Sequence, residues 1–197
     1  MWTYHEMPRV KVSPGFLLIL GVLFWLDEGV GLLPWGLLAC AIHELGHIAA
    51  AALFNGAVKE ISLTAIGAEL RLDYRKPLTY GQESLVALAG PAVNLLFGAM
   101  ALAMSWQLAA VLTLAVGVFN LLPVLPLDGG RVIYGLLAGR LDSDWAERLM
   151  TALSGCLVGA LVGVGTVCAI HYANATLLLT ALWLLAGVLR RGGEGAV

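Results

Sequence analysis

The stretch GVGLLPWGLLACAIHELGHIAAAALF, residues 29–54, is long and apolar enough to cross a lipid bilayer, yet it carries His43, Glu44 and His47 near its centre. A His-Glu-x-x-His run on a helix places two imidazoles one turn apart on one face, where they can share a zinc ion beside a carboxylate. Ionisable residues inside a membrane segment are costly and mark functional sites. The stretch therefore predicts a metalloenzyme that works within the membrane.

The composition agrees with a membrane protein. Of the 197 residues, 60% are hydrophobic and only 12% are charged, whereas a soluble domain is about one quarter charged. The net charge of −2 gives no general attraction to nucleic acid, so no nucleic-acid partner is expected. Cys40, Cys156 and Cys168 lack the spacing of a metal or redox pair and are predicted to be small buried residues. We expect an all-α polytopic membrane protein with one domain over residues 1–197.

Six apolar segments are predicted to span the bilayer, with the first as an uncleaved helix rather than a signal peptide. They cover residues 14–26, 29–54, 84–104, 108–127, 148–170 and 174–189. The eleven Lys and Arg residues support this division, because all of them fall on one side of a six-span arrangement. Under the positive-inside rule, both termini and the two longer loops are then cytoplasmic.

Residues 59–74 have a different pattern, in which apolar and charged side chains roughly alternate. Leu70, Leu72 and Tyr74 share one face, as in a β-strand. The pattern predicts a short β-hairpin on the cytoplasmic side. Two roles are open for it: a plain surface hairpin, or an edge strand that pairs with an extended substrate.

A catalytic zinc usually has three protein ligands, so the two histidines need a partner. His5 lies in the polar N-terminus and His171 on the opposite side of the membrane, which makes both poor candidates. Asp128 lies at the cytoplasmic end of the fourth segment, after two prolines that break the helix, in an Asp-Gly-Gly sequence typical of a tight turn. A loop-capping aspartate would be the ordinary interpretation, but the incomplete zinc pair favours Asp128 as the third ligand.

Glu44 is then the expected catalytic base. A zinc-bound water has a lowered pKa, and a neighbouring carboxylate can take its proton as it attacks a peptide carbonyl. The same acid can return that proton to the leaving amine. The predicted reaction is the hydrolysis of a peptide bond.

Three blocks together resemble the site-2 protease family of intramembrane zinc metalloproteases: His43 to His47, Gly90 to Asn94, and Asn120 through Gly130. The resemblance implies a three-helix catalytic core formed by the second, third and fourth segments, a Zn²⁺ cofactor held by His43, His47 and Asp128, and activation of water by Glu44. It also implies that Asn120 and Asn94 position the substrate or stabilise the oxyanion. A buried asparagine that only joins two helices is the open alternative for each.

The six-span plan is similar to the branch of the sporulation factor-processing protease, without the CBS or PDZ domain found in other members. The resemblance implies a bacterial integral membrane protein that cleaves a transmembrane or membrane-associated protein, such as a transcription-factor precursor, near the cytoplasmic face. A regulatory membrane protein and self-association remain open as partners beside the bilayer. The alternative is a catalytically inactive scaffold or a metal-handling protein of the same fold.

Overall fold

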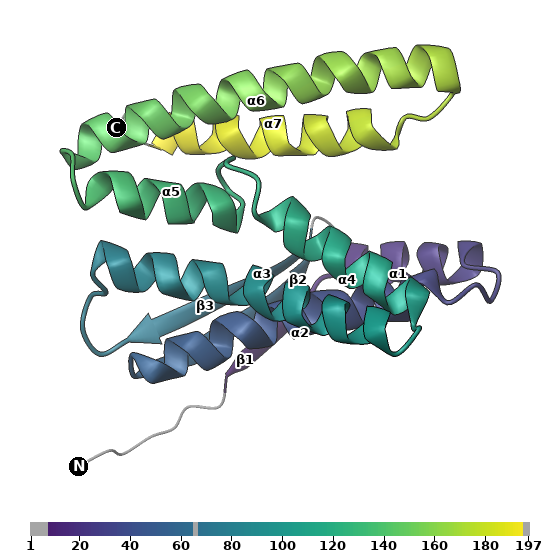
Figure 1. The fold of residues 1–197 in the computed structure, drawn as a ribbon, viewed down its shortest axis with the longest axis horizontal. Helices are drawn as coiled ribbons and strands as arrows, with labels where there is room; N and C mark the ends of the chain where they lie inside the picture. The colour runs from purple at the N-terminus through teal and green to yellow at the C-terminus, as the bar shows by residue number, and fades with distance from the viewer. Residues whose placement is uncertain (1–7, 65–66, 195–197) are drawn as a thin grey trace. The chain divides into compact units, whose positions relative to one another are not determined.

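The computed structural model describes residues 8–64 and 67–194 (Figure 1). His5 lies outside these described residues. The described chain forms two compact units: Met1–Leu78 with Ala89–Gly117, and Thr79–Leu88 with Val118–Val197. In chain order the elements are β1 (Arg9–Val12), α1 (Pro14–Leu26), α2 (Leu32–Leu53), β2 (Gly56–Thr64), β3 (Gly67–Tyr74), α3 (Tyr80–Ala103), α4 (Gln107–Asn120), α5 (Asp128–Ala138), α6 (Ser143–Tyr172) and α7 (Thr176–Glu194).

The first unit contains a small sheet in the order β1-β2-β3. Strands β2 and β3 are antiparallel, so the predicted hairpin is present, and β2 begins earlier than expected, at Gly56. Strand β1 was not predicted; it pairs in parallel with β2, with Arg9 opposite Glu60. A four-residue strand gives almost no periodic signal, and its partner lies about fifty residues further along the chain.

Helices α2 and α3 cross closely in the first unit. A Cβ atom added at Gly46 would lie 2.7 Å from the carbonyl oxygen of Ala89 and 2.9 Å from Cα of Gly90. Without a side chain at either position, the two backbones come together at the level of the histidines. Small residues at helix crossings are typical of membrane proteins, where van der Waals packing drives helix association.

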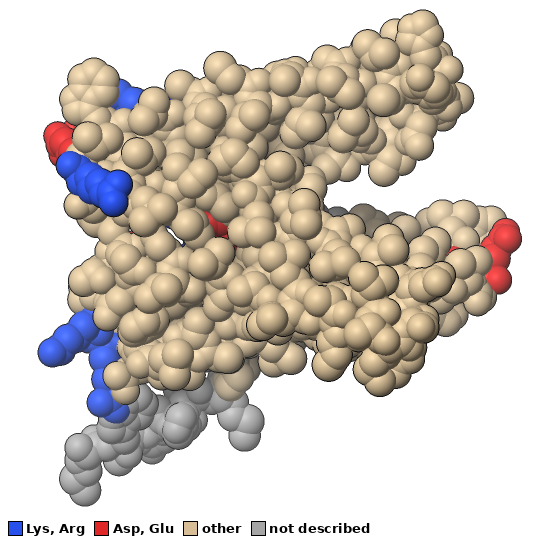
Figure 2. All heavy atoms as spheres, in the orientation of Figure 1, with Lys and Arg blue, Asp and Glu red and all other residues tan. Residues whose placement is uncertain are grey.

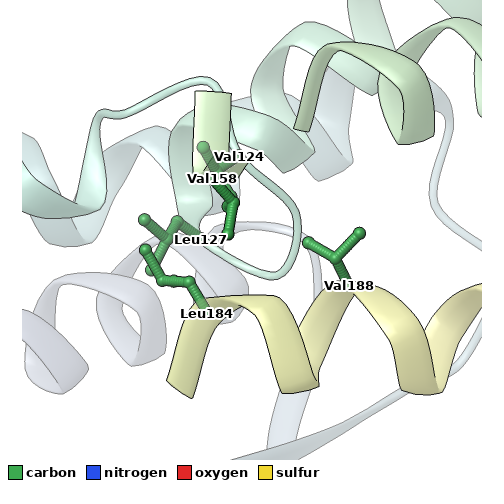
Figure 3. Packing of buried hydrophobic residues seen from close by; sticks show 5 residues of the cluster. All are labelled: Val124, Leu127, Val158, Leu184 and Val188. Atoms are coloured by element: carbon green, nitrogen blue, oxygen red, sulfur yellow. The ribbon is translucent and has the colours of Figure 1, made fainter. Parts of the chain in front are cut away.

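The second unit is built around the antiparallel helices α6 and α7, which lie side by side, with α5 beside α6 (Figure 1). Its core joins the segment before α5 to this helix pair (Figure 3). The members of the core are Val124, Leu127, Val158, Leu184 and Val188. Val124 and Leu127 flank the second proline of the segment, so burial of their side chains fixes the chain directly before Asp128.

The predicted tight turn at Asp128-Gly129-Gly130 is wrong. Helix α4 ends at Asn120, residues 121–127 form an irregular segment, and Asp128 begins α5. The two glycines serve close packing: a Cβ at Gly129 would collide with the backbone of Leu121, and one at Gly130 would lie 2.6 Å from the carbonyl carbon and oxygen of Val124. The predicted fourth segment, 108–127, therefore combines a shorter helix with a segment that folds back against α5.

The predicted burial of the cysteines also needs correction. Cys40 and Cys156 are exposed and Cys168 is partly exposed, because they lie on outer helix faces that a bilayer would cover. Gly155, Gly159 and Gly163 form a stripe of small residues along α6, and no atom of the described residues lies within 4 Å of a Cβ added at any of them. At Gly165, α6 lies close to α7, since an added Cβ would be 2.8 Å from Cα of Leu178.

Helices α2, α3 and α6 are long and apolar enough to cross a membrane, and three shorter apolar helices cover Pro14–Leu26, Gln107–Asn120 and Thr176–Leu189. The visible face is almost entirely uncharged, with charges mainly near the ends of helices (Figure 2). This agrees with an all-α integral membrane protein bearing a small sheet. The six-span count and the cytoplasmic placement of the termini stay predictions.

Candidate metal centre

The first half of the candidate centre is a histidine pair on α2. His43 and His47 are one helical turn apart, and both are buried, with 6% and 7% of their surface exposed. Their Nε2 atoms lie 3.1 Å apart, and the ring planes meet at 86°. Both rings therefore direct the same nitrogen toward one point.

This geometry fits a shared zinc ion. Zinc–nitrogen distances of about 2.0–2.1 Å in a tetrahedral site place two nitrogen ligands roughly 3.3–3.4 Å apart. The observed 3.1 Å separation is close to that value. Two neutral imidazoles can turn both Nε2 lone pairs toward a metal, as zinc ligation requires.

Helix α3 lies directly against the two imidazoles. A Cβ at Gly90 would collide with Nε2 of His47, and it would lie 2.6 Å from Cε1 of His47 and 3.0 Å from Cε1 of His43. Only glycine leaves room here for both rings. Sequence reasoning placed Gly90 in a family block without finding this role, because the requirement arises from the packing of α2 against α3.

Asn94 lies one turn after Gly90 on α3 and is completely buried. Its Nδ2 atom is 3.5 Å from Nδ1 of His43. Its Oδ1 atom is buried without a hydrogen-bond partner, the only side-chain atom of this kind among residues 8–64 and 67–194. Asn94 is therefore placed beside a predicted metal ligand, on the ring edge opposite the shared Nε2 point.

Glu44 follows His43 on α2 and is half-buried. Successive residues of a helix point about 100° apart, so Glu44 neighbours the imidazole pair without sharing its face. A general base has to reach a water molecule at the metal rather than bind the metal itself. The position of Glu44 on the helix suits the predicted base.

The third predicted ligand, Asp128, is the first residue of α5 in the second unit and is 6% exposed. An α-helix N-terminus stabilises a carboxylate through its dipole. Arg131 lies one turn further, with Nη1 3.5 Å from Oδ1 of Asp128. The preceding segment is fixed by the backbone N–H of Leu125, which donates to Oγ of the buried Ser154 at 2.9 Å.

Asn120, the other predicted asparagine, is the last residue of α4 and is half-buried. Arg131 and Ser154 were not singled out from the sequence. Arg131 follows Asp128 at helical spacing, a signal hidden by the expectation of a turn. Ser154 carried no signal in the sequence, because its partner is the backbone N–H of Leu125, 29 residues away in the irregular segment before α5.

His43, His47 and Asp128 are the candidate metal ligands among the described residues, and all three are buried. Two histidines and one carboxylate form a donor set known from catalytic zinc sites, in which water takes the fourth position. The chemistry of the donors thus suits zinc.

Comparisons with known proteins point the same way. Residues 99–161 match the model of Peptidase family M50. Stage IV sporulation protein FB of Bacillus subtilis is 32% identical over 161 residues, which cover 76% of this chain and 56% of that protein. The putative zinc metalloprotease Rip3 of Mycobacterium tuberculosis is 31% identical over 167 residues, covering 73% of this chain and 40% of that protein. The chain thus spans about half the length of the curated relatives it matches.

The fold is similar to the solved structure of the site-2 protease from Methanocaldococcus jannaschii, with a TM-score of 0.69. The match covers 96% of this chain and 93% of that one at 22% sequence identity. The predicted resemblance to the site-2 protease family and the predicted zinc cofactor are therefore confirmed.

Proposed function

We propose that this protein is an intramembrane zinc metalloprotease that cleaves a transmembrane or membrane-associated protein near the cytoplasmic face. The observation that carries the proposal is the buried His43–His47 pair, whose Nε2 atoms lie 3.1 Å apart within an apolar helix. A buried pair of this kind on a membrane helix has no simple structural purpose, because apolar residues would pack there at lower cost.

Asp128 is the proposed third ligand. Its carboxylate is buried at the first turn of α5, although burial of an ionised carboxylate is costly unless it is paired or bound to a metal. The neighbouring Arg131 is half-exposed, with its guanidinium nitrogen 3.5 Å from the carboxylate, and an exposed ion pair of this kind contributes little. A zinc ion bound to this carboxylate would add a positive charge beside it and stabilise its ionised form.

The roles of the protein's own groups follow from this ligand set. When bound, zinc lowers the pKa of a coordinated water toward about 7 and polarises the scissile carbonyl. Glu44 accepts a proton from the attacking water. It then donates that proton to the nitrogen of the leaving amine, so that it ends the cycle ionised as it began.

Asn120 and Asn94 are proposed to position the substrate or stabilise the oxyanion through their amide N–H groups, which can donate to a carbonyl oxygen that gains charge. The β2–β3 hairpin is proposed to present the edge of β3 to an extended substrate, since proteolysis requires unwound backbone. The basic residues support cytoplasmic termini, which would bring the C-terminal half of α2, with the histidines, toward the cytoplasm and its water.

The proposed substrate class is based on the similarity to stage IV sporulation protein FB, whose name connects that relative with sporulation. We propose a membrane-associated precursor, such as that of a transcription factor, released by regulated intramembrane proteolysis in a bacterial cell membrane. A regulatory membrane partner and a homo-oligomer are compatible with this proposal.

The test is Glu44→Gln, with Glu83→Gln as the matched control because Glu83 is exposed at the start of α3. Cells expressing each variant are compared with the wild type for membrane-protein fragments, and the purified proteins are analysed for zinc. We expect Glu44→Gln to keep zinc and lose the fragments, while Glu83→Gln keeps both. Identical fragments in all three strains would support the inactive scaffold or metal-handling alternative.

A further inference from the structure

Asn94 has an arrangement that its proposed contact with substrate does not explain. The side chain is fully buried, its amide lies against Nδ1 of His43, and its Oδ1 atom has no hydrogen-bond partner among the residues that the structure describes. A buried polar atom left without a hydrogen bond costs about 1–3 kcal/mol. The burial of Oδ1 beside a predicted metal ligand, at this cost, therefore requires an explanation.

The position of the proton on a zinc-bound imidazole explains this arrangement. A neutral histidine that binds metal through Nε2 carries its proton on Nδ1, so Nδ1 is then a donor. In metal sites this second N–H is almost always donated to a carboxylate or carbonyl oxygen, which fixes the orientation of the ring. His43 directs Nε2 toward the shared point with His47, so its Nδ1 edge faces Asn94.

We infer that Asn94 is a positioning residue whose Oδ1 atom accepts a hydrogen bond from Nδ1–H of His43 when Nε2 binds zinc. The inference rests on the zinc site proposed above. A half-turn of the Asn94 amide exchanges its nearly equal oxygen and nitrogen ends. In the observed orientation, Nδ2 of Asn94 lies 3.5 Å from Nδ1 of His43. After the half-turn, Oδ1 of Asn94 faces Nδ1–H of His43 and accepts its hydrogen bond, so the buried oxygen gains a partner.

The neighbouring residues keep the amide in place. Gly117 of α4 packs against Asn94, since an added Cβ there would lie 3.1 Å from Cβ of Asn94. The side chain therefore has little room to move away from His43. The inference concerns only the carbonyl end; donation from the amide nitrogen to substrate is a separate role.

Two substitutions distinguish an acceptor from a donor at this position. Asn94→Leu has a similar shape and no polar atoms, whereas Asn94→Asp keeps acceptor oxygens and loses the N–H donors. The control is Thr113→Val, which removes a buried hydroxyl of the same unit that donates to the carbonyl of Ala109 within α4. Zinc affinity is measured by chelator competition in detergent, and unfolding of the metal-free proteins reports on folding.

We expect Asn94→Leu to lose about 10- to 100-fold in zinc affinity, the usual effect of removing such a partner. Asn94→Asp and Thr113→Val should stay within a few-fold of the wild type. Equal losses in both Asn94 variants would assign a donor role, and no loss in Asn94→Leu would leave only packing; either result overturns the inference.

A measurement on the unaltered protein covers the case in which Asn94→Leu does not fold. Nitrogen-15 NMR of zinc-loaded, histidine-labelled wild type should show the proton of His43 on Nδ1, and a bare Nδ1 would overturn the inference. His43→Ala separates this result from the proposed site. Wild-type zinc affinity in His43→Ala would refute the site itself, whereas its loss together with unchanged affinity in Asn94→Leu refutes the positioning role alone.

Discussion

Substitution of Gly90 by alanine adds one methyl group at the point where α3 lies against the histidine pair. That methyl would lie 2.6 Å from Cε1 of His47, about 0.8 Å closer than the 3.4 Å at which ordinary van der Waals contact begins. It would also collide with Nε2 of His47, the proposed ligand atom. The imidazole has to rotate away or the two helices have to separate.

Overpacking of a tight site usually costs about 1–3 kcal/mol. If this strain falls on the metal-bound arrangement, zinc affinity decreases by roughly 5- to 160-fold. A displacement of about 1 Å at reacting groups costs on the order of 100-fold in rate, so proteolysis should decrease further. The assay is chelator competition for zinc, followed by cleavage at saturating zinc.

Gly81→Ala is the control, because Gly81 lies on the same helix and an added Cβ meets no atom within 4 Å. Alanine in a helix is favoured over glycine by up to about 1 kcal/mol, so this variant should bind zinc normally and unfold no earlier than the wild type. Gly90→Ala with wild-type zinc affinity would refute the close approach of α3 to the imidazoles.

Two further predictions concern the segment before Asp128 and the small sheet. Ser154→Ala leaves the buried N–H of Leu125 without its acceptor and should cost about 1–3 kcal/mol of stability, seen as a lower Tm. Ser143→Ala, at the half-buried first residue of the same helix, is the control. Lys11 lowers the pKa of Glu60 through their 2.8 Å ion pair. The stability that this ion pair contributes is therefore present above the ordinary pKa of Glu60, and it is lost as the pH falls through the lowered pKa of the folded protein.

For the ion pair, the measurement is the Tm difference between wild type and Lys11→Met across an acid titration. The difference should be largest near neutral pH and vanish in acid, and a pH-independent difference would contradict the assignment. For Ser154, an unchanged Tm would show that the N–H of Leu125 finds another acceptor.

The histidine half of the site could be predicted from the sequence because it is encoded within one helical turn. His43, Glu44 and His47 need only a helix to take their relative positions, and hydropathy fixes that helix. The long helices were predicted for the same reason, with ends displaced by a few residues. The predicted hairpin was present because its strands are adjacent in the chain.

The elements that sequence reasoning missed depend on contacts between distant segments. Strand β1 exists through its pairing with β2, and the glycines after Asp128 are required by the backbone at Leu121 and Val124 rather than by a turn. An Asp-Gly-Gly sequence after two prolines suits a turn and an α-helix N-terminus equally well by local preference. Only the packing of residues 121–127 decides between them.

The histidine pair and Asp128 are held in place by different elements, so substitutions near them should have different effects on zinc affinity and on local stability. The histidine pair is fixed by α2 and by the close approach of α3, so changes there should act first on zinc affinity. Asp128 is fixed by an irregular segment that depends on the Leu125–Ser154 hydrogen bond and on burial of Val124 and Leu127 in the core of the second unit. Irregular backbone has no helical hydrogen-bond ladder of its own, so weakening of these anchors should let the segment open locally before the whole protein unfolds. We therefore expect activity in Ser154→Ala to fall at temperatures below its Tm, whereas Gly90→Ala loses activity at every temperature.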